Sequence, residues 1–109
     1  MNVVGYGDER DRARAKLGML RERFAERLRD RLGELSGLVE RAHQEPSAGV
    51  LAEAVGAAHR LAGTAGSYGY VEVGEAAAAL ERSLTRIAGG QDEWEAALGA
   101  MSRAREAGP

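Results

Sequence analysis

Apolar residues recur at intervals of three and four positions through four stretches of this chain of 109 residues. In the first stretch, from about residue 12 to 41, they are Leu17, Leu20, Phe24, Leu28, Leu32, Leu35, Leu38 and Val39. A helix of 3.6 residues per turn places such positions on one face, so this spacing predicts a long amphipathic helix. The same periodicity predicts helices over about 47–65 and 71–87, and a fourth from residue 92 onward. We therefore expect an all-α protein, an antiparallel up-down four-helix bundle.

Short breaks separate the predicted helices. The first break contains Pro46, which suits the start of a helix or the connection just before it. The run Gly66-Ser67-Tyr68-Gly69 and the pair Gly89-Gly90 predict the ends of the second and third helices. Asp92 is expected to cap the fourth helix.

The length of the chain is that of one domain, so residues 1–109 are expected to form a single unit. Residues 1–11 contain two glycines and several charges, which predict a loose lead-in with room for one short helical turn. Residues 104–109 are expected to fray.

Composition excludes several classes of function. A net charge of −2 does not provide the basic face that a nucleic acid requires, and the absence of cysteine excludes thiolate metal sites and thiol nucleophiles. The first 14 residues lack the apolar core of a signal peptide, and no apolar run is long enough to span a bilayer. We expect a cytoplasmic protein with no nucleic-acid or membrane partner.

The second predicted helix carries a histidine on an almost bare face. On a helical wheel, His59 lies off the apolar stripe, and its nearest neighbours on its own face are small: Ala52, Gly56, Gly63 and Gly66. A glycine inside a helix costs roughly 0.5–1 kcal/mol relative to alanine, so this arrangement destabilises the helix. The pattern predicts that another protein approaches the imidazole closely.

The run from Ala58 to Gly69 resembles the phospho-accepting motif of the histidine-containing phosphotransfer (HPt) domain family. That family has a leucine two residues, a glycine four residues and a second glycine ten residues after its histidine, and His59 is followed by Leu61, Gly63 and Gly69. The pair Leu80-Glu81 on the next helix also resembles the family, and the likeness is strongest over residues 51–84.

One position departs from the family pattern. Many members carry a lysine three residues after the histidine, where this chain has Ala62. That lysine is thought to favour phosphate binding near the imidazole, so its replacement bears on the rate of transfer and on the choice of partner. Arg60 is adjacent in sequence, but the wheel places it about 100° away, where it is a weak substitute.

The resemblance implies a histidine phosphocarrier of two-component signalling. His59 would accept a phosphoryl group from the aspartyl phosphate of a receiver domain and pass it to another receiver in a multistep phosphorelay. The expected partners are response-regulator receiver domains and a sensor or hybrid histidine kinase, docked around His59 on the exposed edges of the first two helices. No cofactor and no metal are expected on this chain, because Mg²⁺ belongs to the receiver. The carrier would be a monomer and not an enzyme.

Other interpretations remain open at this point. His59 could be an ordinary boundary histidine, or the chain could be an HPt-like helical adaptor that binds a kinase or regulator without being phosphorylated. A dimerising bundle of the histidine-kinase type expects an acidic residue directly after the histidine, where this chain has Arg60. Enzyme catalysis is the weakest alternative, since no base, nucleophile or metal constellation accompanies His59. His43 is expected to be solvated or capping, and Trp94 and Met101 to lie in the core.

Overall fold

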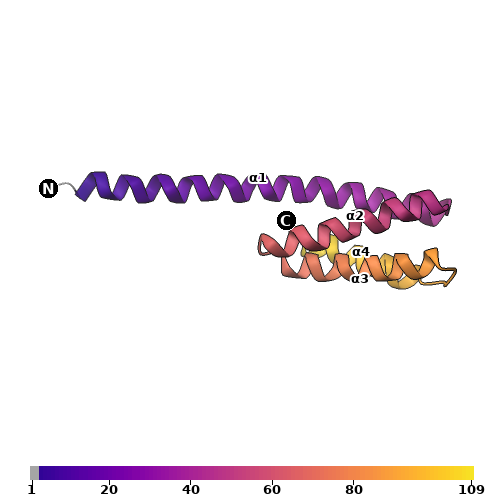
Figure 1. The fold of residues 1–109 in the computed structure, drawn as a ribbon. Coiled ribbons are helices and arrows are strands. Elements are labelled where there is room, and N and C mark those ends of the chain that lie inside the picture. Colours follow the sequence, from indigo (N-terminus) through magenta and orange to yellow (C-terminus); the bar gives the residue numbers. More distant parts are fainter. Residues whose placement is uncertain (1–2) are drawn as a thin grey trace.

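The protein folds into four helices, seen in a computed structural model that describes residues 3–109, with side chains from Asp8 onward. The helices are α1 (Val3–Gln44), α2 (Ala48–Ser67), α3 (Val71–Ala88) and α4 (Trp94–Ala107), and the described residues contain no strand. They pack as an antiparallel bundle, which confirms the predicted fold class (Figure 1). No helix in the described part of the chain is both long enough and apolar enough to cross a membrane.

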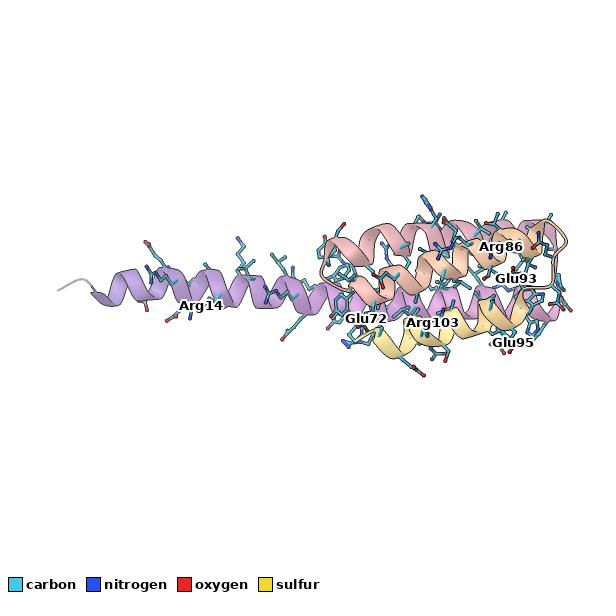
Figure 2. The ribbon with its side chains drawn as sticks, turned by 90° about the horizontal axis from the view of Figure 1, so that it is seen from below. Arg14, Glu72, Arg86, Glu93, Glu95 and Arg103 are labelled. Carbon is cyan, nitrogen blue, oxygen red and sulfur yellow. The ribbon has the colours of Figure 1, made fainter. Side chains whose placement is uncertain are left out.

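Helix α1 is about twice as long as its neighbours, and only its C-terminal half belongs to the bundle (Figures 1 and 2). The bundle buries the α1 side chains Phe24, Leu28, Leu32, Leu35, Val39 and Ala42. Leu17 and Leu20 were predicted on the same buried face, but they are 55% and 52% exposed. That prediction was wrong because α2 and α3 contain only 20 and 18 residues and end before they reach this part of α1.

The predicted loose lead-in is also corrected. Residues 3–11 are helical and continuous with the rest of α1, while residues 1 and 2 lie outside the described residues. Adding a residue to an existing helix contributes one hydrogen bond without a new nucleation cost. Gly5 and Gly7 each oppose this extension by only about 1 kcal/mol, which does not end the helix.

The core is built from the apolar stripes that the sequence indicated. All five predicted inward residues of α2 are buried: Leu51, Ala54, Ala58, Leu61 and Ala65. The six predicted for α3 are buried as well: Val73, Ala76, Ala77, Leu80, Leu84 and Ile87. Both stripes belong to one core that they share with α1 and α4.

Helix α4 differs from the sequence prediction at both ends. Asp92 is not its N-cap, because the helix begins at Trp94 and Glu93 occupies the capping position; the Asp92 carboxylate instead accepts a 3.5 Å hydrogen bond from the backbone N–H of Trp94. The end predicted to fray from residue 104 is ordered as helix through Ala107. Ala104 is fully buried, and the backbone of Gly108 packs against Leu32, so this end is held by α1.

A tight turn joins α2 to α3. Gly69 adopts a φ of 91°, a left-handed conformation that side chains with a Cβ rarely adopt, and this allows α3 to begin two residues later. Beyond the turn the two helices approach closely at Gly74. A Cβ on Gly74 would lie 3.2 Å from the carbonyl oxygen of Ala62 and 3.4 Å from the backbone nitrogen of Gly66. The absence of a side chain at Gly74 therefore sets the α2–α3 spacing.

We predict that Gly74→Val destabilises the protein by about 1–3 kcal/mol, because the added side chain meets the backbone of α2, which cannot yield as a flexible side chain would. Urea unfolding followed by circular dichroism measures this. Gly99→Val in α4 is the matched control, since a Cβ there meets only the tip of Arg103 at 3.6 Å. Equal stability of the two variants would contradict the close-packing argument.

Candidate functional site

His59 lies in the second half of α2 with its side chain directed to solvent. The neighbouring Ala58 is completely buried, whereas the His59 side chain is 75% exposed. The position predicted from the helical wheel, outside the buried stripe, is confirmed. An imidazole so exposed is open to a reaction partner from outside the bundle.

Glu81 of α3 holds the His59 ring. The Nδ1 atom of His59 lies 2.9 Å from both Oε1 and Oε2 of Glu81. An ionised carboxylate only accepts hydrogen bonds, so Nδ1 carries the proton and donates it to the two oxygens. In the neutral ring the lone pair is then on Nε2, the nitrogen that Glu81 does not contact.

The contact between His59 and Glu81 contributes little to the stability of the fold. An ion pair or hydrogen bond with one partner this exposed contributes only about 0–1 kcal/mol to stability. Glu81 itself is about three-quarters buried between the helices, so its carboxylate is held in place while the imidazole is exposed. The contact therefore does little for the fold but fixes the tautomer and direction of the ring.

The strip around His59 is open, as the sequence indicated. Ala52, Arg60, Gly63 and Gly66 are exposed, and Gly56 and Ala62 are half-buried. No atom outside the helix's own backbone lies within 4 Å of a Cβ built on Gly63 or on Gly66. Packing within this chain therefore gives no reason for glycine at either position. Ala62, by contrast, packs beside Gly74 at the helix contact described above.

Arg60 extends along α2 toward Gly56. Its guanidinium lies 3.3 Å from the position that a Cβ on Gly56 would occupy. The arginine thus covers Gly56 and also lines a groove of about 480 Å³ between α1 and α2, together with Arg27, Asp30, Arg31, Glu34, Leu35, Leu38, Ala57 and Leu61. On the other flank of α2, a more apolar groove of about 620 Å³ lies against α3, lined by Pro46, Ser47, Ala48, Leu51, Ala52, Val55, Gly56, Thr85 and Ala88.

The role of Glu81 was missed at the sequence level, although a signal was present. His59 lies eleven residues before Tyr70 and Glu81 eleven residues after it. In an antiparallel helix pair joined by a tight turn, residues equidistant from the turn lie side by side. Gly66 and Gly74 obey the same rule, four residues on either side. The turn signal at Gly66–Gly69 therefore indicated which part of the third helix lies near His59 but not the exact partner, because equal spacing from Gly69 would have pointed to residue 79.

His43 has no part in this site. It lies near the end of α1, where its ring packs against Trp94 with centroids 4.7 Å apart. His43 is exposed, as expected of a solvated side chain, and the contact with Trp94 is an addition to that prediction. Met101 is buried as predicted, while Trp94 is partly buried against the core.

An exposed histidine in the second of four helices, held by a carboxylate of the third, can be compared with known families. The family model for the Hpt domain matches residues 19–107.

The chain belongs to the HPt domain family.

The match covers the whole bundle and omits most of the projecting N-terminal part of α1. No curated protein and no solved structure matches the chain significantly. Membership implies a role in histidine phosphotransfer within a phosphorelay, because Hpt domains are phosphocarriers rather than catalysts. It also implies interaction with receiver domains and kinases.

We predict that Glu81→Ala changes the tautomer of His59 without unfolding the domain. In the wild type, nitrogen NMR should show neutral His59 protonated at Nδ1, and the variant should show a mixture of both tautomers because the acceptor is gone. Glu75→Ala, an exposed position on the same helix, is the control and should leave the His59 signals unchanged. The same mixture in wild type and Glu81→Ala would show that the contact does not orient the ring.

Proposed function

We propose that this HPt domain carries a phosphoryl group on Nε2 of His59 between the receiver domains of a multistep phosphorelay. The observation that carries the proposal is the contact of His59 Nδ1 with both carboxylate oxygens of Glu81. It occupies one ring nitrogen as a donor and leaves the other as a nucleophile facing solvent. Family membership over residues 19–107 supports the same chemistry.

The transfer step follows from this arrangement. The Nε2 lone pair attacks the phosphorus of a receiver's aspartyl phosphate, in line with the bond to the aspartate oxygen. The new P–N bond forms as that P–O bond breaks, and the electron pair leaves with the aspartate carboxylate. The imidazole then carries positive charge with its proton still on Nδ1, where the Glu81 carboxylate stabilises it. The reverse reaction passes the group to a second receiver.

The chain supplies little of the positive charge that neutralises the phosphoryl group during transfer. Within the described residues, no basic side chain forms an ion pair with Glu81 other than His59, and Ala62 stands where many relatives have lysine. We therefore assign neutralisation of the phosphate to the receiver and its Mg²⁺. On this proposal the domain contributes an oriented nucleophile and a surface on which the receiver docks.

The docking surface is the strip of Ala52, Gly56, Ala62, Gly63 and Gly66, with Arg60 at its edge and the exposed edge of α1 beside it. Gly63 and Gly66 support this assignment, since no contact inside the chain requires them. A receiver must bring its phosphoaspartate within bonding reach of Nε2, and side chains one turn away on the same face would separate the two backbones. Bare backbone at these positions permits the approach.

We predict that receiver domains bearing aspartyl phosphate transfer it to the wild-type chain and not to His59→Gln. The label should be lost in acid and retained in base, as expected of a phosphorylated imidazole. His43→Gln is the matched control, because it removes the other histidine and should be labelled like the wild type. Labelling of His59→Gln would overturn the assignment, and binding of a receiver without labelling of any variant would favour the adaptor.

We predict opposite effects of Gly63→Ala on stability and on transfer. The substitution should stabilise the domain by about 0.5–1 kcal/mol, since alanine is the better helix former and its Cβ meets nothing. Transfer should slow, and Gly63→Leu should slow it about 10- to 100-fold by holding the phosphoaspartate out of reach. Gly99→Ala in α4, a helix that does not contact α2, should stabilise without slowing transfer. Unchanged rates in both Gly63 variants would show that the strip is not needed for approach.

A further inference from the structure

Residues 8–23 of α1, here called the projecting segment, extend beyond the bundle and are exposed at every position (Figure 1). Ala13, Leu17 and Leu20 lie within about 40° of Phe24 around the helix axis. They continue the same stripe that the bundle buries from Phe24 onward. The bundle thus covers one half of an apolar seam and leaves the other half without a partner in this chain.

The adjoining end of the bundle is apolar as well. The ring of Tyr68, in the turn after α2, stacks on Phe24 with centroids 3.7 Å apart, yet Tyr68 is 61% exposed. Val71, at the start of α3, is also largely exposed. Together with Leu17 and Leu20, these side chains form a step where the projecting helix leaves the bundle. Large apolar side chains gathered in this way are typical of an interaction surface.

Charge along the projecting segment is divided between its two ends. Residues 8–11 hold three acids and one base, whereas residues 12–23 hold five bases and one acid. Arg14 is among these bases and extends from the helix well away from the bundle (Figure 2). In the part of the chain whose side chains are described, Arg14, Lys16, Arg21 and Arg23 are in no ion pair. The segment therefore fits a helix whose charges run in the reverse order.

We propose that the projecting segments of two copies of this chain pair antiparallel, through Leu17 and Leu20. When the two segments overlap fully in that orientation, the acidic residues 8–11 of each copy lie beside residues 20–23 of the other, which include Arg21 and Arg23. A parallel pair would instead set base against base and acid against acid. The antiparallel arrangement has a two-fold axis, so each surface is used once by each copy, as in most homodimers.

The apolar step gives this pair a second contact. An antiparallel partner helix that follows Leu17 and Leu20 toward the bundle reaches the exposed Tyr68 and Val71. Sixteen residues of helix span only about 24 Å, which on its own is a short coiled coil. Contact with the bundle end enlarges the buried area toward what a specific interface needs. The pair would be a rod, with one bundle at each end.

This pairing leaves the proposed phosphotransfer site open. His59 is on the outer face of α2, nine residues before Tyr68, and its side chain is not part of the step. The inference therefore does not rest on the proposed function. The sequence analysis expected a monomer; the proposed pairing departs from that expectation because the structure leaves Leu17 and Leu20 uncovered.

Sedimentation equilibrium tests the dimer. We expect the full chain to show twice the mass of its 11.6 kDa monomer, and the double variant Leu17→Glu/Leu20→Glu to be monomeric. Met19→Glu is the matched control, because Met19 is equally exposed at 54% but lies on the opposite side of the helix. The double variant should keep the wild-type circular dichroism and unchanged His59 labelling. A monomer at all concentrations up to the solubility limit would overturn the proposal. In that case, weaker binding of a receiver by the double variant would indicate that the step formed by Leu17, Leu20, Tyr68 and Val71 is a docking site for receivers instead.

Two further measurements test the orientation. Reversal of Asp8, Glu9 and Asp11 to lysine should dissociate the dimer, since the new lysines would lie beside Arg21 and Arg23 of the other copy. The chain has no cysteine, so Asp8→Cys and Ala15→Cys each allow one spin label per chain. In an antiparallel pair the distance between the two labels is longer at residue 8 than at residue 15. Equal distances at both positions would show a parallel pair and overturn the arrangement.

Discussion

The close contact between α2 and α3 determines where the functional side chains lie. Gly74 brings the backbone of α3 against Ala62 and Gly66, and the left-handed Gly69 makes the connecting turn tight. These two glycines fix the register of the helix pair. At that register, the Glu81 carboxylate meets Nδ1 of His59. The orientation of the proposed nucleophile is therefore a consequence of the backbone packing at Ala62 and Gly66, one to two turns further along α2.

Two opposite reasons account for glycine at Gly74 and for glycine at Gly63 and Gly66. Gly74 faces inward, where the backbone of another helix occupies the space of a side chain. Gly63 and Gly66 face outward into open space, where alanine would fit and would make a more stable helix. A position that lowers stability without a packing reason is typical of a surface kept for a partner. On the proposed function, that partner is a receiver domain whose phosphoaspartate must come within bonding distance of His59.

The long first helix divides the molecule into two parts. Its C-terminal half supplies one wall of the bundle through residues such as Leu28 and Leu35, while its N-terminal half carries the same apolar pattern into solvent. The family match begins at residue 19, close to where this division falls. The phosphotransfer function proposed for the bundle and the self-association proposed for the projecting segment thus belong to separate surfaces of one helical scaffold. On these proposals, a substitution in one surface is expected to leave the other intact.

Periodicity in the sequence was sufficient to determine four helices, the buried stripes of α2 and α3, and the exposed position of His59. These features are local, because the side of a helix on which a residue lies depends only on its spacing from its neighbours. The sequence did not reveal that Leu17 and Leu20 are uncovered, since an apolar stripe shows which face seeks a partner but not whether the bundle reaches it. Nor did it reveal the contact of Glu81 with His59, which are 22 residues apart in the chain. That contact was decided by the tertiary structure, because it depends on the register of α2 against α3, which the packing of Gly74 and the turn at Gly69 set together.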